Sequence, residues 1–326
     1  MHKDFSIEEY KQTFLTENRL EELYEEKLFK LFVPKIYGGL EMSLSEGSKR
    51  LTEIATVQGG MGWSLNLGAG ANWFSGFFSD KAAQEIFSPK KAVIAGSGFA
   101  SGSFERDGEQ FIINGTWSRC TGAHHATFFS LNATNENGET KTFVIPRSQV
   151  KLADEKWQII GLRNSSSYAI DIHNEKIPAH YEFKINKIVN PHAYGVHAIP
   201  FESFARVCMS ASFIGIVKCL VNKCRAYPVN DAALKLIDEK LQPQIIKAEI
   251  ACTDWANEIE NCVQSNQMTT EITQQLKSTL GANNLGLFDS VQQVFLAGGL
   301  PFVEEDKLIH WAYRDVLTAV QHFMVK

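Results

Sequence analysis

FERDGEQFIINGTWSRCTGAHHATFFSL, residues 104–131, decides the fold class. It contains two short runs rich in aromatic and β-branched residues, and the turn signal ERDGE precedes the first of them. Such runs between turn signals are typical of β-strands. The same texture extends from about residue 91 to residue 185, where several runs alternate apolar and polar residues as strands with one buried face do. The middle of the chain is therefore predicted to be a small β-domain.

The flanks of this β-rich segment have the spacing of helices. Apolar residues three and four apart occur before residue 90 and again after residue 202, where four helical segments follow one another. These segments are 203–227, 243–263, 269–299 and 306–323. Helices and strands that are segregated along the chain argue against a βαβ architecture. We therefore predict an α+β fold with an N-terminal helical domain at 1–90, a middle β-domain at 91–200 and a C-terminal helical bundle at 201–326.

The composition is that of a globular protein. Of 326 residues, 44% are hydrophobic and 21% are charged, and this length predicts two or three packed units. The net charge of -5 is mild and no block of like charge occurs, so neither nucleic acid nor an anionic membrane is expected as a partner. The polar start is unlike a signal peptide, and no apolar run approaches the roughly 18 residues that span a bilayer. The six cysteines form no CxxC pair, which favours reduced thiols and a cytoplasmic protein.

The glycine-rich segment AVIAGSGFASG, residues 92–102, is similar to a dinucleotide fingerprint. That fingerprint requires a strand, a glycine turn and then a helix. Here a turn and a further strand follow, so the context argues against it. Two interpretations stay open. The segment is a turn rich in small residues, or its backbone leaves room for a flat ligand beside Gly96, Ser97 and Gly98.

Metal and nucleophilic sites are also disfavoured. His124 and His125 are neighbours on an expected strand, where adjacent side chains point to opposite faces, so the two rings cannot easily share a metal ion. One of them is expected to face a pocket, and the other solvent or another subunit. Cys120 has no clear base partner, and the chain contains no G-x-S-x-G elbow.

Several segments, in the right order, resemble the acyl-CoA dehydrogenase superfamily of flavoproteins. They carry a V-P-x-x-Y-G-G entry, a strand pair, a Gly-x-Arg segment, and a closing Gly-Gly, aromatic-Arg-Asp and Gln-His signature. The segments are 33–65, 104–131, 159–183, 294–302 and 310–323. The resemblance covers most of the chain. It implies an N-terminal helical domain, a middle antiparallel β-barrel-like domain and a C-terminal four-helix bundle.

The resemblance also implies a flavin, FAD or FMN, between the β-domain and the bundle. A second subunit often completes that site, so a homo-oligomer (dimer or tetramer) is expected. An isoalloxazine ring needs an apolar slot and hydrogen-bond donors for its polar edge. Trp117 is expected to form a wall beside the ring. Backbone N–H groups near Thr121 and the Thr121 hydroxyl are expected to meet the polar edge of the ring. Ser165 and Ser167 are also expected there, although a polar turn explains these two serines equally well. The expected cofactor-binding residues are Trp117, Cys120, Thr121, Gly122, Ser165, Ser167 and Arg314.

The catalytic base separates the possible reactions. An acyl-CoA dehydrogenase needs a carboxylate beside the flavin to remove the α-proton of its substrate. The superfamily keeps this base eight residues after the Asp of its Arg-Asp pair, or just before an Arg early in the first bundle helix. Those positions hold Phe323 and Ala205 here. The chain therefore resembles the oxygenase components of two-component flavin monooxygenases, of the 4-hydroxyphenylacetate hydroxylase type, which oxygenate a small organic substrate with O2 and reduced flavin from a separate reductase.

His322 and His125 are the catalytic candidates that this resemblance implies. His322 matches the closing histidine of that branch, and His125 matches the histidine that follows its small-residue segment. A histidine suits the task because its pKa lies near neutrality, so it can donate a hydrogen bond or deprotonate a phenol. His322 also has two plainer interpretations, as a frayed end or a core histidine. In that branch a further histidine often occurs two residues before a Trp, and the matching position holds Ala71 here.

Two other interpretations stay open. The chain is an acyl-CoA dehydrogenase with a displaced base, or a member of the superfamily that binds no flavin. The short bundle, about 120 residues long, favours FMN or a diffusible reduced flavin over tightly bound FAD.

Overall fold

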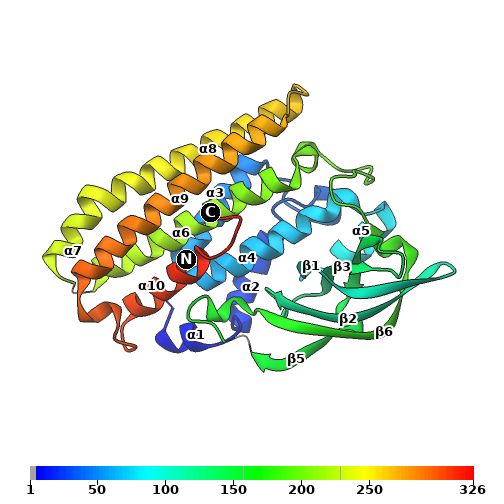
Figure 1. Cartoon of the computed structure of the whole chain (residues 1–326), viewed down its shortest axis with the longest axis horizontal. Helices are drawn as coiled ribbons and strands as arrows, with labels where there is room; N and C mark the ends of the chain where they lie inside the picture. The colour runs from blue at the N-terminus through cyan, green and yellow to red at the C-terminus, as the bar shows by residue number, and fades with distance from the viewer. Residues whose placement is uncertain (1–4, 157, 228) are drawn as a thin grey trace.

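The computed structural model describes residues 5–156, 158–227 and 229–326. Helices come first, a seven-stranded sheet follows, and a bundle of long helices completes the chain (Figure 1). The helices before the sheet are α1 (Ile7–Lys11), α2 (Glu17–Glu25), α3 (Leu44–Val57), α4 (Gly59–Asn72) and α5 (Asp80–Phe87). The strands are β1 (Ile94–Asp107), β2 (Gln110–Cys120), β3 (Phe128–Thr134), β4 (Thr140–Pro146), β5 (Lys151–Lys156), β6 (Tyr168–Pro178) and β7 (Glu182–Phe183). The helices after it are α6 (Phe201–Ala226), α7 (Asp231–Leu236), a π-helix (Ile237–Leu241), α8 (Gln242–Gln264), α9 (Thr270–Gly298) and α10 (Leu308–Ala319).

The α+β fold class is confirmed, but the sheet is mixed and not antiparallel as expected. Its strand order is β5-β6-β2-β1-β3-β4-β7, and β1 pairs with β3 in parallel while the other neighbours are antiparallel. β1 lies between β2 and β3. The chain leaves β2, passes to the other edge of β1 and then runs in the direction of β1. The sequence pattern predicted the strands, but the expectation of antiparallel pairing throughout did not include the crossover from β2 to β3.

The β-rich texture also predicts a strand over WQIIGL, residues 157–162, but its described residues 158–162 form none. Trp157 is outside the described residues, and the strand of this region is β5, which ends at Lys156. Leu162 has a left-handed backbone with φ of 52°, which a strand cannot accommodate. Ile160, whose side chain a half-buried strand would bury, is 52% exposed.

α6 is the central helix of the bundle and packs against α3, α4, α8, α9 and α10. By length and composition α6 is apolar enough to cross a membrane, contrary to the sequence estimate that no such run exists. However, 89% of its most apolar window is buried inside the protein, as in the core helix of a soluble protein. Its apolar character therefore comes from contacts with helices on several sides.

α4 lies between the bundle and the sheet (Figure 1), and it contacts both α6 and β1. Trp73 follows α4 and is completely buried, with its ring stacked on Phe204 at 4.4 Å between centroids. Its indole N–H donates to the carbonyl of Val196 at 3.0 Å. This contact joins the end of α4 to the start of α6, so the two helices hold a fixed separation beside the sheet.

The N-terminus of α3 offers a test of local stability. The Ser43 side chain accepts a hydrogen bond from the amide of Glu46 at 3.2 Å, and the Glu46 carboxylate accepts one from the amide of Ser43 at 2.9 Å. Replacing such a cap with alanine typically costs about 1 kcal/mol because helix N–H groups lose their partner. We expect Ser43→Ala to lower the free energy of unfolding by about this amount in urea titrations. A loss well under about 0.5 kcal/mol would show that the cap contributes little.

Candidate functional site

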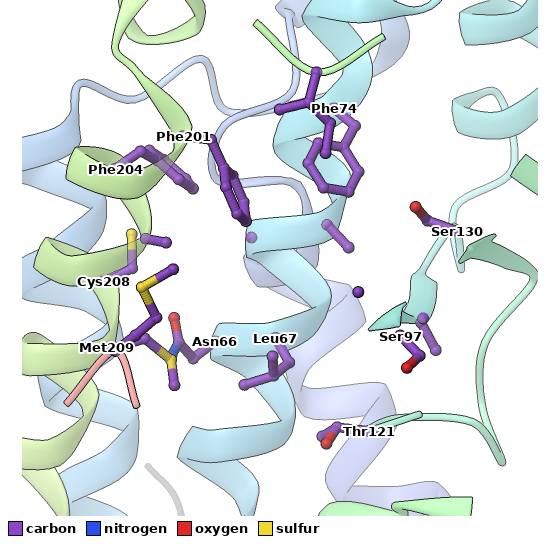
Figure 2. A pocket seen from close by; sticks show the side chains of 18 of the residues that line it. Asn66, Leu67, Phe74, Ser97, Thr121, Ser130, Phe201, Phe204, Cys208 and Met209 are labelled. Carbon is purple, nitrogen blue, oxygen red and sulfur yellow. The ribbon is translucent and has the colours of Figure 1, made fainter. Parts of the chain in front are cut away.

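A cavity of about 440 Å³ lies where α4, α6, the sheet and the C-terminal segment meet. Pockets for small molecules and cofactors typically occupy about 300–1,000 Å³. Figure 2 shows Phe74, Phe201 and Phe204 together at one end of the cavity, and hydroxyl groups on the side of the sheet. The hydroxyl-bearing residues there are Ser97, Thr121 and Ser130. The cavity therefore has an aromatic end and a polar wall, which suits a flat ligand with one polar edge.

His322 lines this cavity, although the helix that was expected to carry it ends at Ala319. The residues after α10 form turns, in which His322 Nδ1 accepts a hydrogen bond from the Met324 amide at 3.3 Å. The rings of Trp63 and His322 lie in a T-shaped arrangement with 5.6 Å between their centroids. Burial lowers the pKa of His322 to about 4, so the ring is neutral near pH 7. Because Nδ1 accepts, the proton of the neutral ring resides on Nε2, which becomes a hydrogen-bond donor.

Two buried side chains of the bundle anchor the segment that carries His322. Asn284 of α9 donates to the carbonyl of Val325 at 2.8 Å and to the Ser210 hydroxyl at 2.9 Å. Arg206 of α6 donates to the carbonyl of Lys326 at 3.0 Å. Asn284 and Arg206 are only 1% and 4% exposed. The segment is therefore fixed at its far end as well as at α10, and His322 lies between the two attachment points.

The positions at which the resemblance expects other reactive groups also line the cavity. Ala205 and Phe323 stand where the superfamily keeps its carboxylate base, and Ala71 stands where the oxygenase branch often has a histidine. None of the described residues that line the cavity is an Asp or a Glu. Proton abstraction by a carboxylate inside this cavity is therefore not available to the described residues.

Thr121 connects the cavity to a chain of buried hydroxyl groups. Its Oγ1 lies 2.8 Å from Ser167 Oγ, which lies 3.1 Å from Ser165 Oγ. Thr121 lines the cavity, whereas the two serines are buried behind it. The serines belong to a polar turn, and that turn supports the cavity wall.

The loop around Gly122 uses its donors within the protein. The amide of Gly122 donates to the carbonyl of Ser165 at 3.0 Å, so it is not offered to a ligand as the sequence analysis expected. Gly122 has φ of 82°, a backbone conformation that favours glycine. Cys120 is completely buried, and burial raises the pKa of its thiol to about 12. Neither residue lines the cavity.

Trp117 is a core residue of the sheet and does not line the cavity. Its indole N–H donates to the carbonyl of Asn132 at 2.8 Å, and a Cβ added to Gly102 would lie 2.2 Å from its ring. The pairing of β2 with β6 shifts register between Trp117 and Cys120, and Arg119 has φ of 61°. This irregularity breaks the alternation of faces. It directs Thr121 to the cavity while Trp117 stays in the core.

His124 and His125 lie in a turn and not on a strand, so the argument from alternating faces does not hold for them. They still diverge, because His124 is exposed and stacks on Phe14 at 4.3 Å between centroids. His125 lies 3.4 Å from the Ser64 hydroxyl, measured from its Nε2. Burial lowers the pKa of His125 to about 3. Neither histidine lines the cavity, so the structure does not bring His125 together with His322 there.

Arg314 and Asp315 point to different surroundings. Arg314 donates to the carbonyl of Ile160 and lies 3.0 Å from His310 Nε2, with its guanidinium 4.5 Å above the Trp311 ring. It lines a wide groove on the outer side of the sheet, not the cavity. Asp315 is buried in the interior, 3% exposed. The Arg-Asp pair of the sequence is therefore two residues with separate contacts.

Comparison with known proteins gives relatives of one kind. The flavin-dependent monooxygenase oxygenase subunit HsaA of Mycobacterium tuberculosis is 25% identical over 202 residues, which is 58% of this chain and 50% of that protein. The oxygenase component of p-hydroxyphenylacetate 3-hydroxylase from Acinetobacter baumannii is 26% identical over 226 residues, 63% of this chain and 53% of that protein. The chain spans about half the length of the curated relatives it matches. No protein-family model matches the chain.

Solved structures match over nearly the whole chain. A 3-HSA hydroxylase from Rhodococcus sp. RHA1 has a TM-score of 0.88 at 17% identity and covers 98% of this chain and 90% of its own. XiaF from Streptomyces sp., in complex with FADH2 and glycerol, has a TM-score of 0.87 at 17% identity and covers 98% of this chain and 87% of its own. The chain has the acyl-CoA dehydrogenase-like fold of these solved structures. The predicted fold is confirmed, and the relatives named above are of the oxygenase kind that the sequence resembles.

Within this fold, two of the residues that sequence reasoning assigned to catalysis or cofactor binding line the cavity, and the aromatic end of the cavity was missed. His322 and Thr121 line the cavity, as expected of site residues. The aromatic end was missed because Phe201 and Phe204 come from α6 and Phe74 from the segment after α4, and none of them belongs to a motif. The glycine-rich segment at residues 92–102 was a signal, since one interpretation of it placed a flat ligand beside its backbone and its Gly96, Ser97 and Gly98 line the cavity.

Proposed function

We propose that the chain is the oxygenase component of a two-component flavin-dependent monooxygenase that acts on a small aromatic substrate. The observation that carries the proposal is the cavity, which holds His322 and, among its described lining residues, no carboxylate. Dehydrogenation of an acyl-CoA needs a carboxylate base, whereas oxygenation by a reduced flavin does not. The names of the relatives support the same reaction class.

The cavity fits a flavin ring by its shape and its groups. A Cβ added to Gly70 or Gly98 would meet nothing within 4 Å, so both glycines leave open space in the cavity wall. The backbone of Gly96 to Gly98 would lie along the ring, and the hydroxyls of Ser97 and Thr121 would meet its polar edge. When bound, the reduced flavin supplies the two electrons that activate O2. One oxygen atom enters the substrate and the other leaves as water.

His322 holds a proton at Nε2 and donates it as a hydrogen bond into the cavity. The Met324 amide keeps Nδ1 an acceptor, and the lowered pKa keeps the ring neutral. A neutral donor fixed in a buried site stabilises negative charge that develops on oxygen as the reaction proceeds. This role is preferred over deprotonation of a phenol, because the nitrogen that would accept the phenolic proton already carries one.

The substrate would occupy the aromatic end of the cavity. Phe74, Phe201 and Phe204 form an apolar surface there. Such a surface excludes water and packs against another ring. We therefore propose an uncharged aromatic ring at this end, with a separate flavin reductase as the partner that supplies reduced FMN or FAD.

Anaerobic titration with reduced FMN and reduced FAD tests the proposal. We expect binding at micromolar concentrations, and product formation from a panel of phenols and indoles once oxygen is admitted. Absence of binding by either reduced flavin would leave the flavin-free scaffold as the better account. In a second arm, an acyl-CoA is added without oxygen to the protein loaded with oxidised flavin. Bleaching of the flavin absorbance would favour the dehydrogenase.

Filling the cavity provides a more local prediction. Gly70 is in the interior of α4, where a residue with a side chain favours the helix by roughly 0.5–1 kcal/mol, so Gly70→Leu should not lower the free energy of unfolding. Its side chain would project into the open space. We expect product formation to fall by on the order of tenfold or more, equivalent to about 1.4 kcal/mol. Gly195→Leu is the matched control, because Gly195 also has open space around its Cβ and does not line the cavity.

A homo-oligomer, dimer or tetramer, is part of the proposal. Leu296, Leu300 and Val303 follow one another at the end of α9 and beyond, and they are 80%, 68% and 54% exposed. Exposed apolar patches often lie in subunit contacts, and these three side chains are candidates for such a patch. Light scattering after size exclusion tests this, and a monomer would remove it. The six cysteines are free and buried, which supports the proposed cytoplasmic location.

A further inference from the structure

Asp315 of α10 lies where separate parts of the chain come together. Its Oδ1 accepts a hydrogen bond from the Leu162 amide at 2.5 Å, and its Oδ2 accepts one from Gln58 Nε2 at 3.3 Å. Gln58 precedes α4, and Leu162 is the first residue of the serine turn, residues 162–167. The side chain of Asp315 is buried, and the described cavity lining does not include it. Asp315 therefore joins three elements without touching the cavity itself.

Two glycines make this approach possible. A Cβ added to Gly59 would lie 2.6 Å from Asp315 Oδ2. A Cβ added to Gly161 would lie 2.0 Å from the carbonyl oxygen of Arg314. Contacts this short would force the backbones of α4, the serine turn and α10 apart. The glycines thus bring the carboxylate of Asp315 within reach of both donors.

The turn at residues 162–167 is held in an unfavourable conformation. Leu162 and Ser166 are in the left-handed region, with φ of 52° and 63°. For residues other than glycine, such conformations cost about 1–3 kcal/mol each and persist only where surrounding contacts hold them. The Leu162 amide is held by Asp315, and Asn164 Nδ2 donates to Gln58 Oε1 at 3.3 Å. The carboxylate of Asp315 is thus the hydrogen-bond partner of Leu162, the first of the two residues with a left-handed backbone.

The same turn supports the polar wall of the cavity. The carbonyls of Ser165 and Ser166 accept the amides of Gly122 and Ala123, each at 3.0 Å. Ser167 Oγ lies 2.8 Å from Thr121 Oγ1. A change in the turn would therefore move or release the Thr121 hydroxyl and the loop that follows it.

We propose that Asp315 is a positioning residue for the cavity: by accepting the Leu162 amide it holds the turn 162–167, and through the turn it fixes the Thr121 hydroxyl and the Gly122 loop. The consequence for flavin binding rests on the proposed function. The positioning itself does not, because it is a property of hydrogen bonds within the chain.

Amide hydrogen exchange measured by mass spectrometry tests the positioning. Asp315→Leu and Asp315→Ala remove the acceptor, and Asp315→Asn keeps an oxygen for the Leu162 amide. Ser290→Ala is the matched control, since it deletes another buried polar group of the bundle, whose hydroxyl donates to Gln244 Oε1 at 3.0 Å. Two peptides are followed, one covering residues 119–127 and the other residues 160–168, with peptides of α6 as the internal reference.

We expect Asp315→Leu to speed exchange by on the order of tenfold in both peptides while α6 stays protected, as in a local opening. Asp315→Asn should restore most of the protection, and Ser290→Ala should leave both peptides unchanged. The proposal is overturned if only the 160–168 peptide responds, or if Asp315→Asn behaves like Asp315→Leu. It is also overturned if exchange rises everywhere to the same extent. Asp315→Ala is measured in the same way, so that a folding failure of the leucine variant leaves the test intact.

A second measurement separates this inference from the proposed function. Binding of reduced FMN is titrated anaerobically for the same variants. We expect Asp315→Leu to bind on the order of tenfold more weakly, with Asp315→Asn close to the unmodified protein. If the unmodified protein binds no flavin, the proposed function fails and the exchange data still decide the positioning. If flavin binding is the same in all variants although exchange changes, the turn does not position the flavin-facing wall and the inference fails.

Discussion

His322→Ala should lower the rate of substrate oxygenation by on the order of 10²–10³-fold, the usual loss when one fixed donor is removed from a site that stabilises developing charge. The protein should stay folded, because the segment that carries His322 is anchored independently by Asn284 and Arg206. Turnover supplied with reduced flavin measures the effect. His322→Gln, which keeps an N–H donor, should recover part of the rate.

The state of the His322 ring makes this prediction sharper. Since burial lowers the pKa of His322 to about 4, the neutral ring persists down to acidic pH. The pH profile of the rate between about pH 5.5 and pH 8 should therefore contain no inflection caused by His322. The profile of His322→Ala should have the same shape in this range. His173→Ala, at an exposed position of β6, is the control for loss of an imidazole. An unchanged rate in His322→Ala would return this residue to a packing role against Trp63.

The fold was largely predictable because its signals are local. Strand texture and helical spacing gave the order of elements, and several motif segments in sequence gave the oxygenase fold. Details that depend on distant pairing were not predictable. The parallel contact of β1 with β3 needs a crossover that no local pattern marks. α10 ends at Ala319 and not near 323, because the last residues are anchored by side chains of α6 and α9. The division into three domains at 90 and 200 stays a prediction.

The site was predictable only where a motif residue happened to face the cavity. His322 and Thr121 do so, whereas Trp117 belongs to the same motif as Thr121 and faces the core. The difference comes from the register shift near Cys120 and the left-handed backbone of Arg119, which a sequence pattern does not display. The aromatic end is assembled from residues of α6 and the segment after α4, so its members are adjacent only in three dimensions.

Asp315 belongs to the Arg-Asp motif, but the motif does not explain what this residue does. The sequence analysis put Arg314 in the cofactor site and gave no role to its neighbour. In the structure the arginine faces outward, and the carboxylate enters the interior. A charge is expensive to bury unless several donors satisfy it. Burial raises the pKa of Asp315 to about 7, while the Leu162 amide, Arg314 and the Gly60 amide act in the opposite direction. Nearby Cys219 stays a neutral thiol because burial raises its pKa to about 11.

The contribution of Asp315 to stability should consequently fall as the pH rises through the window between these two protonation equilibria. The ordinary pKa of the carboxyl is 3.8 and its folded value is about 7. Well below pH 3.8 the group is protonated in both the folded and the unfolded chain. As the pH rises further, the unfolded chain ionises first, and this favours unfolding until the folded carboxyl ionises near pH 7. At about 1.36 kcal/mol for each pKa unit, the loss amounts to about 4 kcal/mol.

Asp315→Asn removes this dependence because the amide does not ionise. We expect the free energy of unfolding of the variant, minus that of the unmodified protein, to increase by about 4 kcal/mol between pH 4 and pH 8. The contributions of the histidines cancel in this difference, since both proteins contain them. Urea titrations at several pH values give the slope, and Asp289→Asn, at an exposed position of α9, is the control for loss of one negative charge. A difference that stays constant with pH would mean that Asp315 is ionised in the folded protein throughout, held by its donors against the cost of burial.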